Sequence, residues 1–292
     1  MGTSAEATYQ AARRSGSGLR RRIRRAAPPL AGLVLIVLVW QFGASLLEIP
    51  TYLLPRPTDL AEAAVENREQ LVQSLLRTAA SSVSGLALAI VLGITGAVVL
   101  GLSNVIERSL FPYAVMLQTI PTIAIAPIVV IWIGPGFRSI VAVSFIISFF
   151  PMFSNTSVGL HSVDPEAVNL FRLFGASRWR TMWKLRLPGA MPYIMAGVRI
   201  SAGLSVIGAI VGEFVAGTGG GQGGLGFLVS VAATQLKTAL LMTGALAGGI
   251  LGVTFYLITK LVTRKILAWH ESTLPEKDEE GWKIVPVEAG GA

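Results

Sequence analysis

The stretch that decides the fold runs from His161 to Pro192 and reads HSVDPEAVNLFRLFGASRWRTMWKLRLPGAMP, between two long apolar runs. It is the largest polar interruption in the apolar part of the chain, and it carries five basic residues against two acidic ones. A chain with so few polar segments has few places where it can meet a soluble partner. We therefore expect 161–192 to be the main contact surface for one.

Local chemistry predicts two short helices and a turn within this stretch. Asp164 can accept hydrogen bonds from the free N–H groups of a first helical turn, and Pro165 suits the first helical position. Gly175 can take the left-handed conformation that ends a helix. Ser177 can cap a second helix, which we expect Pro188 to stop.

The first of these helices has an apolar side. Ala167, Leu170, Phe171 and Phe174 fall at helical spacing on one face. An apolar face of this size is unfavourable in water unless another surface covers it. The spacing therefore predicts a partner that receives this face.

The same stretch resembles the cytoplasmic coupling loop, or EAA loop, of permease subunits of binding-protein-dependent ABC importers. That pattern is Glu-Ala-Ala, three residues, Gly, nine residues, Ile, one residue and Leu-Pro. Gly175, Leu185, Leu187 and Pro188 match it in register, with Leu185 in place of the Ile. The resemblance covers about 53–269 and is nearest to the branch that handles nitrate, taurine and other sulfonates, and thiamine or flavin precursors.

The Glu-Ala-Ala positions themselves depart from the pattern, because they hold Asn169, Leu170 and Phe171. The nearest carboxylate is Glu166, three residues earlier on the same helical side. The resemblance implies that Phe171, Leu173 and Phe174 enter a groove on an ATPase subunit. The implied coupling residues are Glu166, Asn169, Leu170, Phe171, Phe174, Gly175, Ser177, Leu187 and Pro188.

Composition agrees with a membrane protein. Of the 292 residues, 52% are hydrophobic and 14% are charged, whereas soluble domains average about 25% charged residues. The absence of cysteine excludes disulfides, thiol catalysis and cysteine metal sites. We therefore predict an all-α polytopic membrane protein, with the fold of a type I ABC importer permease implied by the resemblance.

Apolar runs predict six transmembrane helices. They lie at about 29–47, 83–102, 111–133, 139–158, 192–216 and 238–262. The chain then divides into five parts. They are a basic tail (1–28), a first transmembrane helix (29–47), an external segment (48–82), a five-helix permease core (83–262) and a second tail (263–292). A cleaved signal peptide is the competing interpretation of the first span, but its apolar region would be only about 7–15 residues long.

Charge distribution sets the predicted orientation. With both termini in the cytoplasm, eighteen of the 24 Lys and Arg residues lie inside and five lie outside. The positive-inside rule therefore predicts cytoplasmic termini and a cytoplasmic 161–192. We expect a multi-pass protein of the bacterial plasma membrane.

Two charges, Arg199 and Glu213, fall within the predicted fifth span. Intramembrane charges usually have a function, so we hypothesise that their shared helix face lines the transport path. The alternative is that each side chain snorkels to its nearer interface. The possible path residues are Met116, Gln118, Thr119, Asn155, Arg199 and Glu213.

Several other function classes find little support. No Gly-Lys dipeptide occurs, so the phosphate loop of ATPases is absent and ATP must be bound by a partner subunit. The Gly-rich string 219–224 lacks the strand and acidic residue of a dinucleotide site, and we expect an outer loop there.

The two histidines form no metal or triad pattern, so we expect no cofactor, metal or catalytic site in this chain. A DNA-binding helix–turn–helix would be pinned to the membrane, so no nucleic-acid partner is expected.

The resemblance thus implies a permease subunit of an ATP-driven importer for a small polar solute. The implied partners are an ATPase subunit, an extracytoplasmic solute-binding protein, a second permease copy forming a homodimer, and membrane lipid. The substrate is of the thiamine-precursor, pyrimidine or flavin type, or of the sulfonate, taurine or nitrate type. The alternative is an ATPase-independent secondary transporter or channel, for which inverted repeats and several intramembrane charges would be typical.

Overall fold

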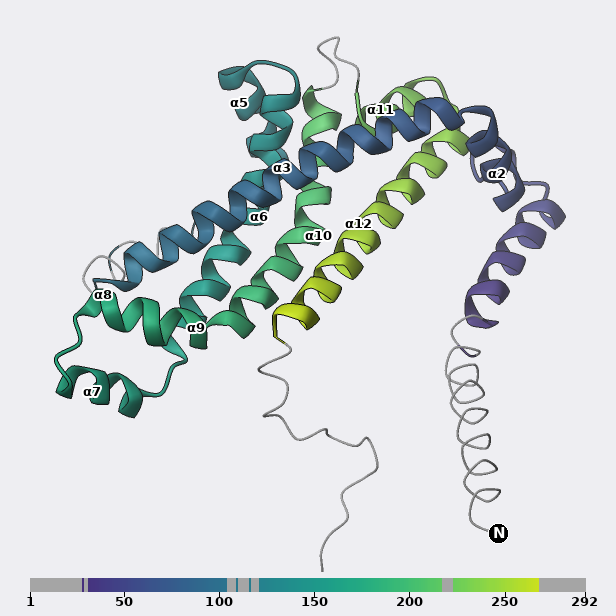
Figure 1. The fold of residues 1–292 in the computed structure, drawn as a ribbon. Coiled ribbons are helices and arrows are strands. Elements are labelled where there is room, and N and C mark those ends of the chain that lie inside the picture. The colour runs from purple at the N-terminus through teal and green to yellow at the C-terminus, as the bar shows by residue number, and fades with distance from the viewer. Residues whose placement is uncertain are drawn as a thin grey trace, which may run out of the picture. The chain divides into compact units, whose positions relative to one another are not determined.

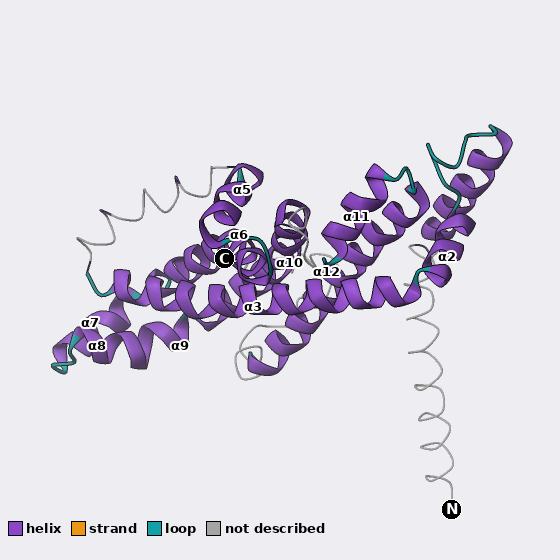
Figure 2. Ribbon diagram, turned by 90° about the horizontal axis from the view of Figure 1, so that it is seen from above, coloured by secondary structure: helices purple, strands orange, loops and turns teal. Residues whose placement is uncertain are grey.

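The computed structural model describes residues 28, 31–103, 109, 116, 121–216 and 223–267, and every regular element in that part is a helix (Figure 1 and Figure 2). In chain order the labelled helices are α2 (Pro57–Glu66), α3 (Arg68–Gly101), α5 (Thr122–Ile133), α6 (Phe137–His161), α7 (Pro165–Leu173), α8 (Arg178–Thr181), the π-helical turn η1 (Met182–Arg186), α9 (Leu187–Gly189), α10 (Met191–Ala216), α11 (Leu225–Thr234) and α12 (Thr238–Ile266).

Four helices, α3, α6, α10 and α12, are long and apolar enough to cross a membrane. They contain 34, 25, 26 and 29 residues, and at about 1.5 Å per residue each exceeds the roughly 30 Å hydrocarbon core of a bilayer. They match the predicted second, fourth, fifth and sixth spans. Shorter apolar helices, Ala31–Leu46 and Ile123–Ile133, lie within the predicted first and third spans. The all-α membrane fold is confirmed.

Contacts group the chain into two compact units. One comprises residues 1–87, 119–147 and 204–252, and the other comprises 88–118, 148–203 and 253–292. The four long helices contribute residues to both. Each unit is described by itself below.

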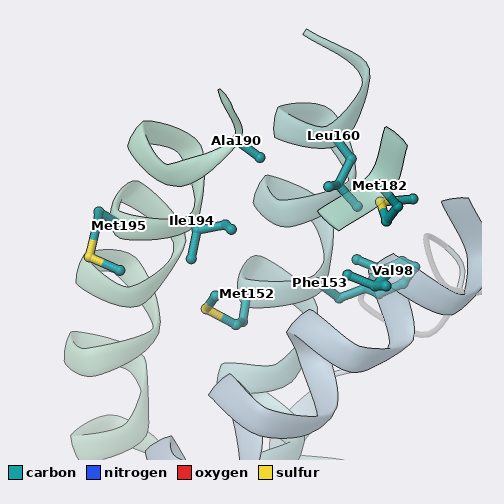
Figure 3. Packing of buried hydrophobic residues seen from close by; sticks show 9 residues of the cluster. Val98, Met152, Phe153, Leu160, Met182, Ala190, Ile194 and Met195 are labelled. Atoms are coloured by element: carbon teal, nitrogen blue, oxygen red, sulfur yellow. The ribbon is translucent and has the colours of Figure 1, made fainter. Parts of the chain in front are cut away.

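The second unit has an apolar core built from α3, α6, η1 and α10. Figure 3 shows Val98, Phe153, Met152 and Ile194 directed into a common cluster, together with Met182. Met182 is 1% exposed, so its side chain fixes η1 to the long helices of this unit. The rings of Phe149 and Phe153 stack with centroids 5.8 Å apart. Between such apolar helices, close packing supplies the attraction.

In the first unit, small residues let α3, α6 and α10 approach closely. A Cβ at Gly208 of α10 would lie 2.7 Å from the Cα of Ser144 in α6, and one at Gly212 would lie 3.1 Å from the Cα of Ile140. The Ser144 hydroxyl also donates to the carbonyl oxygen of Ser205 at 2.8 Å. Small residues and hydroxyls at helix contacts are typical of membrane bundles.

A similar contact joins α6 and α10 in the second unit. The Ser201 hydroxyl donates to the carbonyl oxygen of Ser148 at 2.8 Å, and a Cβ at Gly197 would lie 3.1 Å from the Cβ of Asn155. Ser148 and Ser201 are both fully buried. The backbone of Ser148 thus takes part in an interhelical hydrogen bond.

Three sequence expectations differ from the structure. Pro188 does not stop a helix, because it lies inside α9, two residues after the last residue of η1. In the π-helical turn the Leu187 N–H donates to the carbonyl oxygen of Met182, five residues earlier. The helix therefore continues to Pro188, which has no N–H to donate. Only Ala190, with φ −78° and ψ −8°, separates α9 from α10.

The second difference lies at Pro121. The third span was expected to run through this residue with a kink, but Pro121 has an extended ψ of 119° and α5 starts after it. Proline has no N–H and its ring collides with the preceding turn, so it begins a helix more readily than it continues one. Most of 111–120 lies outside the described residues.

The third difference is the length of the helix that contains the second predicted span. Helix α3, which contains the second predicted span, begins at Arg68, 15 residues before the predicted start of that span at 83. Ser82 donates to the carbonyl oxygen of Thr78 at 2.6 Å, so polar side chains are satisfied within the helix itself. Helix α11 was not predicted at all, because it follows a glycine-rich string and precedes the expected sixth span.

Candidate functional site

The coupling segment begins with the predicted cap. The Asp164 carboxylate accepts a hydrogen bond from the Glu166 N–H at 2.9 Å, and Pro165 occupies the first position of α7. Glu166 itself is exposed in the first turn, where a negative charge complements the helix dipole. The helix start follows directly from the Asp-Pro-Glu sequence.

The end of α7 also follows from the sequence. Gly175 has φ +70°, the left-handed conformation in which glycine has no steric cost. The Ala176 N–H donates to the carbonyl oxygen of Phe171 at 2.9 Å and closes the turn. The Ser177 hydroxyl then accepts from the Arg180 N–H at 3.2 Å and caps α8. Both predicted caps and the glycine turn are confirmed.

Helix α7 exposes most of its large apolar side chains. Leu170, Leu173 and Phe174 are 52%, 85% and 81% exposed, whereas Val168 is 8% exposed and faces inward. Phe171 is half-buried, and Asn169 is exposed. A nine-residue helix that is capped at its start and apolar on its outer side is suited to docking in a groove.

The remaining coupling residues lie where the chain returns to the long helices. Leu187 is half-buried and Pro188 is exposed, and both belong to α9. Beside them, Trp179 and Trp183 meet edge to face with ring centroids 5.7 Å apart. These two rings are about half exposed, as aromatic residues at membrane interfaces usually are.

The possible path residues are not all described. Gln118 and Thr119 lie outside the described residues, and Met116 is 65% exposed. Asn155 is half-buried, and its side-chain amide donates to the carbonyl oxygen of Pro151, one turn earlier in α6, at 2.8 Å. Arg199 is half-buried in α10, and its Nε has no hydrogen-bond partner among the described residues.

Glu213, also in α10, is 1% exposed and does not reach solvent in this structure. Its carboxylate accepts from the Gly226 N–H at 2.9 Å and from the Thr78 hydroxyl at 2.9 Å. The Thr78 oxygen in turn accepts from the Leu225 N–H at 2.8 Å. The first two N–H groups of α11 are thus bound by side chains of α10 and α3, which completes a cap that Gly224 has no side chain to supply.

Two glycines allow the start of α11 to lie this close to α10 and α3. A Cβ at Gly224 would overlap the Glu213 carboxylate and the Thr78 hydroxyl, and a Cβ at Gly226 would overlap the carbonyl oxygen of Ile210. Sequence reasoning singled out Glu213 because it is a charge within a span, but missed Thr78 and the glycines. No local signal pairs Thr78 with a residue 147 positions away.

Comparison with known proteins decides the family. The model of the family described as "Binding-protein-dependent transport system inner membrane component" matches residues 82–268. The chain belongs to this family. The match includes α3 from residue 82 onward, all of α6, α10 and α12, and the whole segment from α7 to α9.

Individual members of the family are similar over most of their length. The riboflavin transport system permease protein RibX of Chloroflexus aurantiacus is 33% identical over 242 residues, which are 82% of this chain and 89% of that protein. The formylaminopyrimidine transport permease protein ThiX of Halalkalibacterium halodurans is 32% identical over 252 residues, 86% and 99% of the two chains. The taurine transport system permease protein TauC of Escherichia coli is 27% identical over 82% of this chain and 88% of that protein.

A solved structure has the same fold. A chain of the MetNI methionine ABC transporter in an inward-facing conformation matches with a TM-score of 0.60 at 17% identity, covering 69% of this chain and 98% of that chain. The protein is therefore a multi-pass inner-membrane permease of an ABC importer, as the resemblance implied. Its family is one of transport components rather than enzymes.

Proposed function

We propose that this permease couples to a separate ATPase subunit through α7, and that ATP is bound and hydrolysed only in that partner. Support comes from the outer side of α7, where Leu170, Leu173 and Phe174 are exposed. Exposed large apolar side chains clustered on a short capped helix are typical of a protein contact. This exposed apolar side of α7 is the observation that carries the proposal.

Two permease copies then form the transport path as a homodimer in lipid, and an extracytoplasmic binding protein delivers the solute. Both termini lie in the cytoplasm in this proposal, because eighteen of the 24 Lys and Arg residues then lie inside. The Arg199 Nε is buried without a partner among the described residues. A buried intramembrane donor that finds no partner in the described part of the chain needs one from elsewhere, so we assign Arg199 to the path or to the second copy.

The solute we propose is a nitrogen heterocycle of the pyrimidine or flavin type. Support comes from the two relatives named for a formylaminopyrimidine and for riboflavin, at 32% and 33% identity. The taurine permease is less similar, at 27%. A sulfonate is the second candidate, favoured by the 31% identity to the aliphatic sulfonates permease SsuC of Escherichia coli.

Co-purification tests the coupling. The double variant Leu173→Ser and Phe174→Ser should lose a co-expressed ATPase subunit that the intact protein retains in detergent. Leu53→Ser is the matched control, because Leu53 is also exposed, at 68%, but lies in the predicted external segment. Retention of the ATPase by the double variant would remove α7 from the contact, and its loss from the Leu53→Ser control would show that the effect is unspecific.

Uptake tests the substrate. The assembled importer in proteoliposomes should accumulate a labelled aminopyrimidine or riboflavin in an ATP-dependent way when its binding protein is supplied, and should not accumulate taurine. ATP-dependent uptake of taurine alone would assign the protein to the sulfonate class. Uptake without ATP would favour the secondary transporter instead.

A further inference from the structure

A small cavity lies beside the coupling segment in the second unit. Its volume is about 80 Å³, and the end of α3, helix α7 and the α8–η1 run contribute its walls. Leu102, Val168 and Met182 supply apolar surface. In Figure 1, α7 lies opposite the run from α8 to α9, to which it is joined through the Gly175 turn.

Three arginines line this cavity: Arg172 from α7, Arg178 from α8 and Arg186 from η1. Among the described residues that line it, none is acidic. Arg178 makes one long hydrogen bond, from Nη1 to the carbonyl oxygen of Leu102 at 3.5 Å. None of the three forms an ion pair within the portion of the chain that the structure describes.

The positive-inside rule explains why this segment is basic, but not why three of its charges share one cavity. Arg180 and Lys184 belong to the same segment and do not line it. Like charges held together repel one another, and the repulsion grows where water is partly excluded. Arg186 is half-buried, so the arrangement gains stability if an anion occupies the cavity.

We propose that this three-arginine cavity binds a phosphate group, carried either by a lipid head group or by a soluble phosphate ester. Guanidinium groups donate paired hydrogen bonds that match phosphate oxygens, and a phosphate has enough oxygens to serve three of them. A water molecule needs a cavity of only about 10–15 Å³, so a cavity of about 80 Å³ accommodates a tetrahedral oxyanion. The proposal goes beyond the transport function and does not depend on docking of α7.

Binding to the full-length protein tests it. The protein is purified in a maltoside detergent, which contains no phosphate, and is stripped of lipid. One arm measures binding of labelled glycerol 3-phosphate by equilibrium dialysis. The other arm adds phosphatidylglycerol and counts retained lipid by native mass spectrometry. Binding of glycerol 3-phosphate identifies a soluble ester as sufficient, whereas retention of phosphatidylglycerol alone identifies the lipid.

Matched variants locate the site. Arg172→Gln combined with Arg178→Gln should weaken binding at least about tenfold, because charge-assisted hydrogen bonds are lost. Arg178→Lys should weaken it less, because the charge stays and only the paired geometry is lost. Arg180→Gln, which removes an equal charge outside the cavity, should leave binding unchanged.

Two results would overturn the proposal. One is that neither probe binds the intact protein. The other is that Arg180→Gln weakens binding as much as the double variant does, which would indicate diffuse attraction rather than a site. The single variants Arg172→Gln and Arg178→Gln, checked for an unchanged elution volume and thermal transition, keep the test decisive if the double variant is unstable.

Discussion

The carboxylate of Glu213 accepts a hydrogen bond from the backbone N–H of Gly226 at 2.9 Å, so a side chain of α10 caps the start of α11. The same carboxylate accepts from Thr78 of α3. Three helices of the first unit therefore meet at one buried acidic group. Helix α11 has ten residues, too few to be stable in isolation, and depends on such tertiary contacts.

Removing the Glu213 carboxylate should loosen α11. Glu213→Ala leaves the Gly226 N–H and the Thr78 hydroxyl without this acceptor in a buried site, at a cost of about 1–3 kcal/mol. Glu213→Gln keeps an acceptor for Gly226 and should cost less. Hydrogen–deuterium exchange of the 225–234 amides measures the difference. Equal protection in the intact protein and in Glu213→Ala would contradict the capping role.

A methyl group at Gly224 should have a similar effect by a different route. In Gly224→Ala the added Cβ overlaps the Glu213 carboxylate and the Thr78 hydroxyl, so α11 must shift. Gly249→Ala in α12 is the control, because nothing lies within 4 Å of its Cβ position. We expect a lower thermal transition in detergent for Gly224→Ala only. A comparable decrease for Gly249→Ala would mean that the glycine cradle is not the cause.

Close packing between α6 and α10 should matter more than the hydrogen bond beside it. Gly208→Ala places a Cβ 2.7 Å from the Cα of Ser144 and should destabilise the protein by about 1–3 kcal/mol. Ser144→Ala removes an interhelical hydrogen bond worth about 0.6 kcal/mol in membrane proteins. Unfolding in denaturing detergent compares them, with Gly203→Ala, whose Cβ position is open, as control. The reverse order of the two effects would refute this account.

Substitutions at Gly175 should follow the cost of the left-handed conformation. Glycine adopts a φ of +70° without strain, and asparagine tolerates it. For most other residues this conformation costs about 1–2 kcal/mol. Gly175→Asn should therefore retain more ATPase-coupled uptake than Gly175→Ala, and Gly175→Val should retain the least. Limited proteolysis of 161–192 reports the turn itself. Equal behaviour of all three variants would show that this turn does not set the orientation of α7.

Local chemistry predicted the coupling segment well. The bonds at Asp164, Ser177 and the Gly175 turn join residues two to five positions apart, so the sequence alone contains these interactions. The long apolar helices were predicted for a similar reason, since length and apolarity suffice to identify a span. These features required no knowledge of distant contacts.

Features that depend on distant partners were not predictable. Helix α11 begins at a glycine without a capping side chain, and its cap comes from residues 13 and 147 positions away. The convergence of Arg172, Arg178 and Arg186 depends on how α7 folds back toward η1. The passage through Pro188 depends on the hydrogen-bond register of η1, which residue preferences do not reveal.

The near-continuous path from α8 through η1 and α9 into α10 has a mechanical meaning. Only Ala190 interrupts it, and Ala190 keeps helical φ and ψ signs. Met182 anchors η1 within the apolar core of the second unit. We therefore expect a displacement of α8 to be transmitted to the first half of α10, because no flexible loop lies between them.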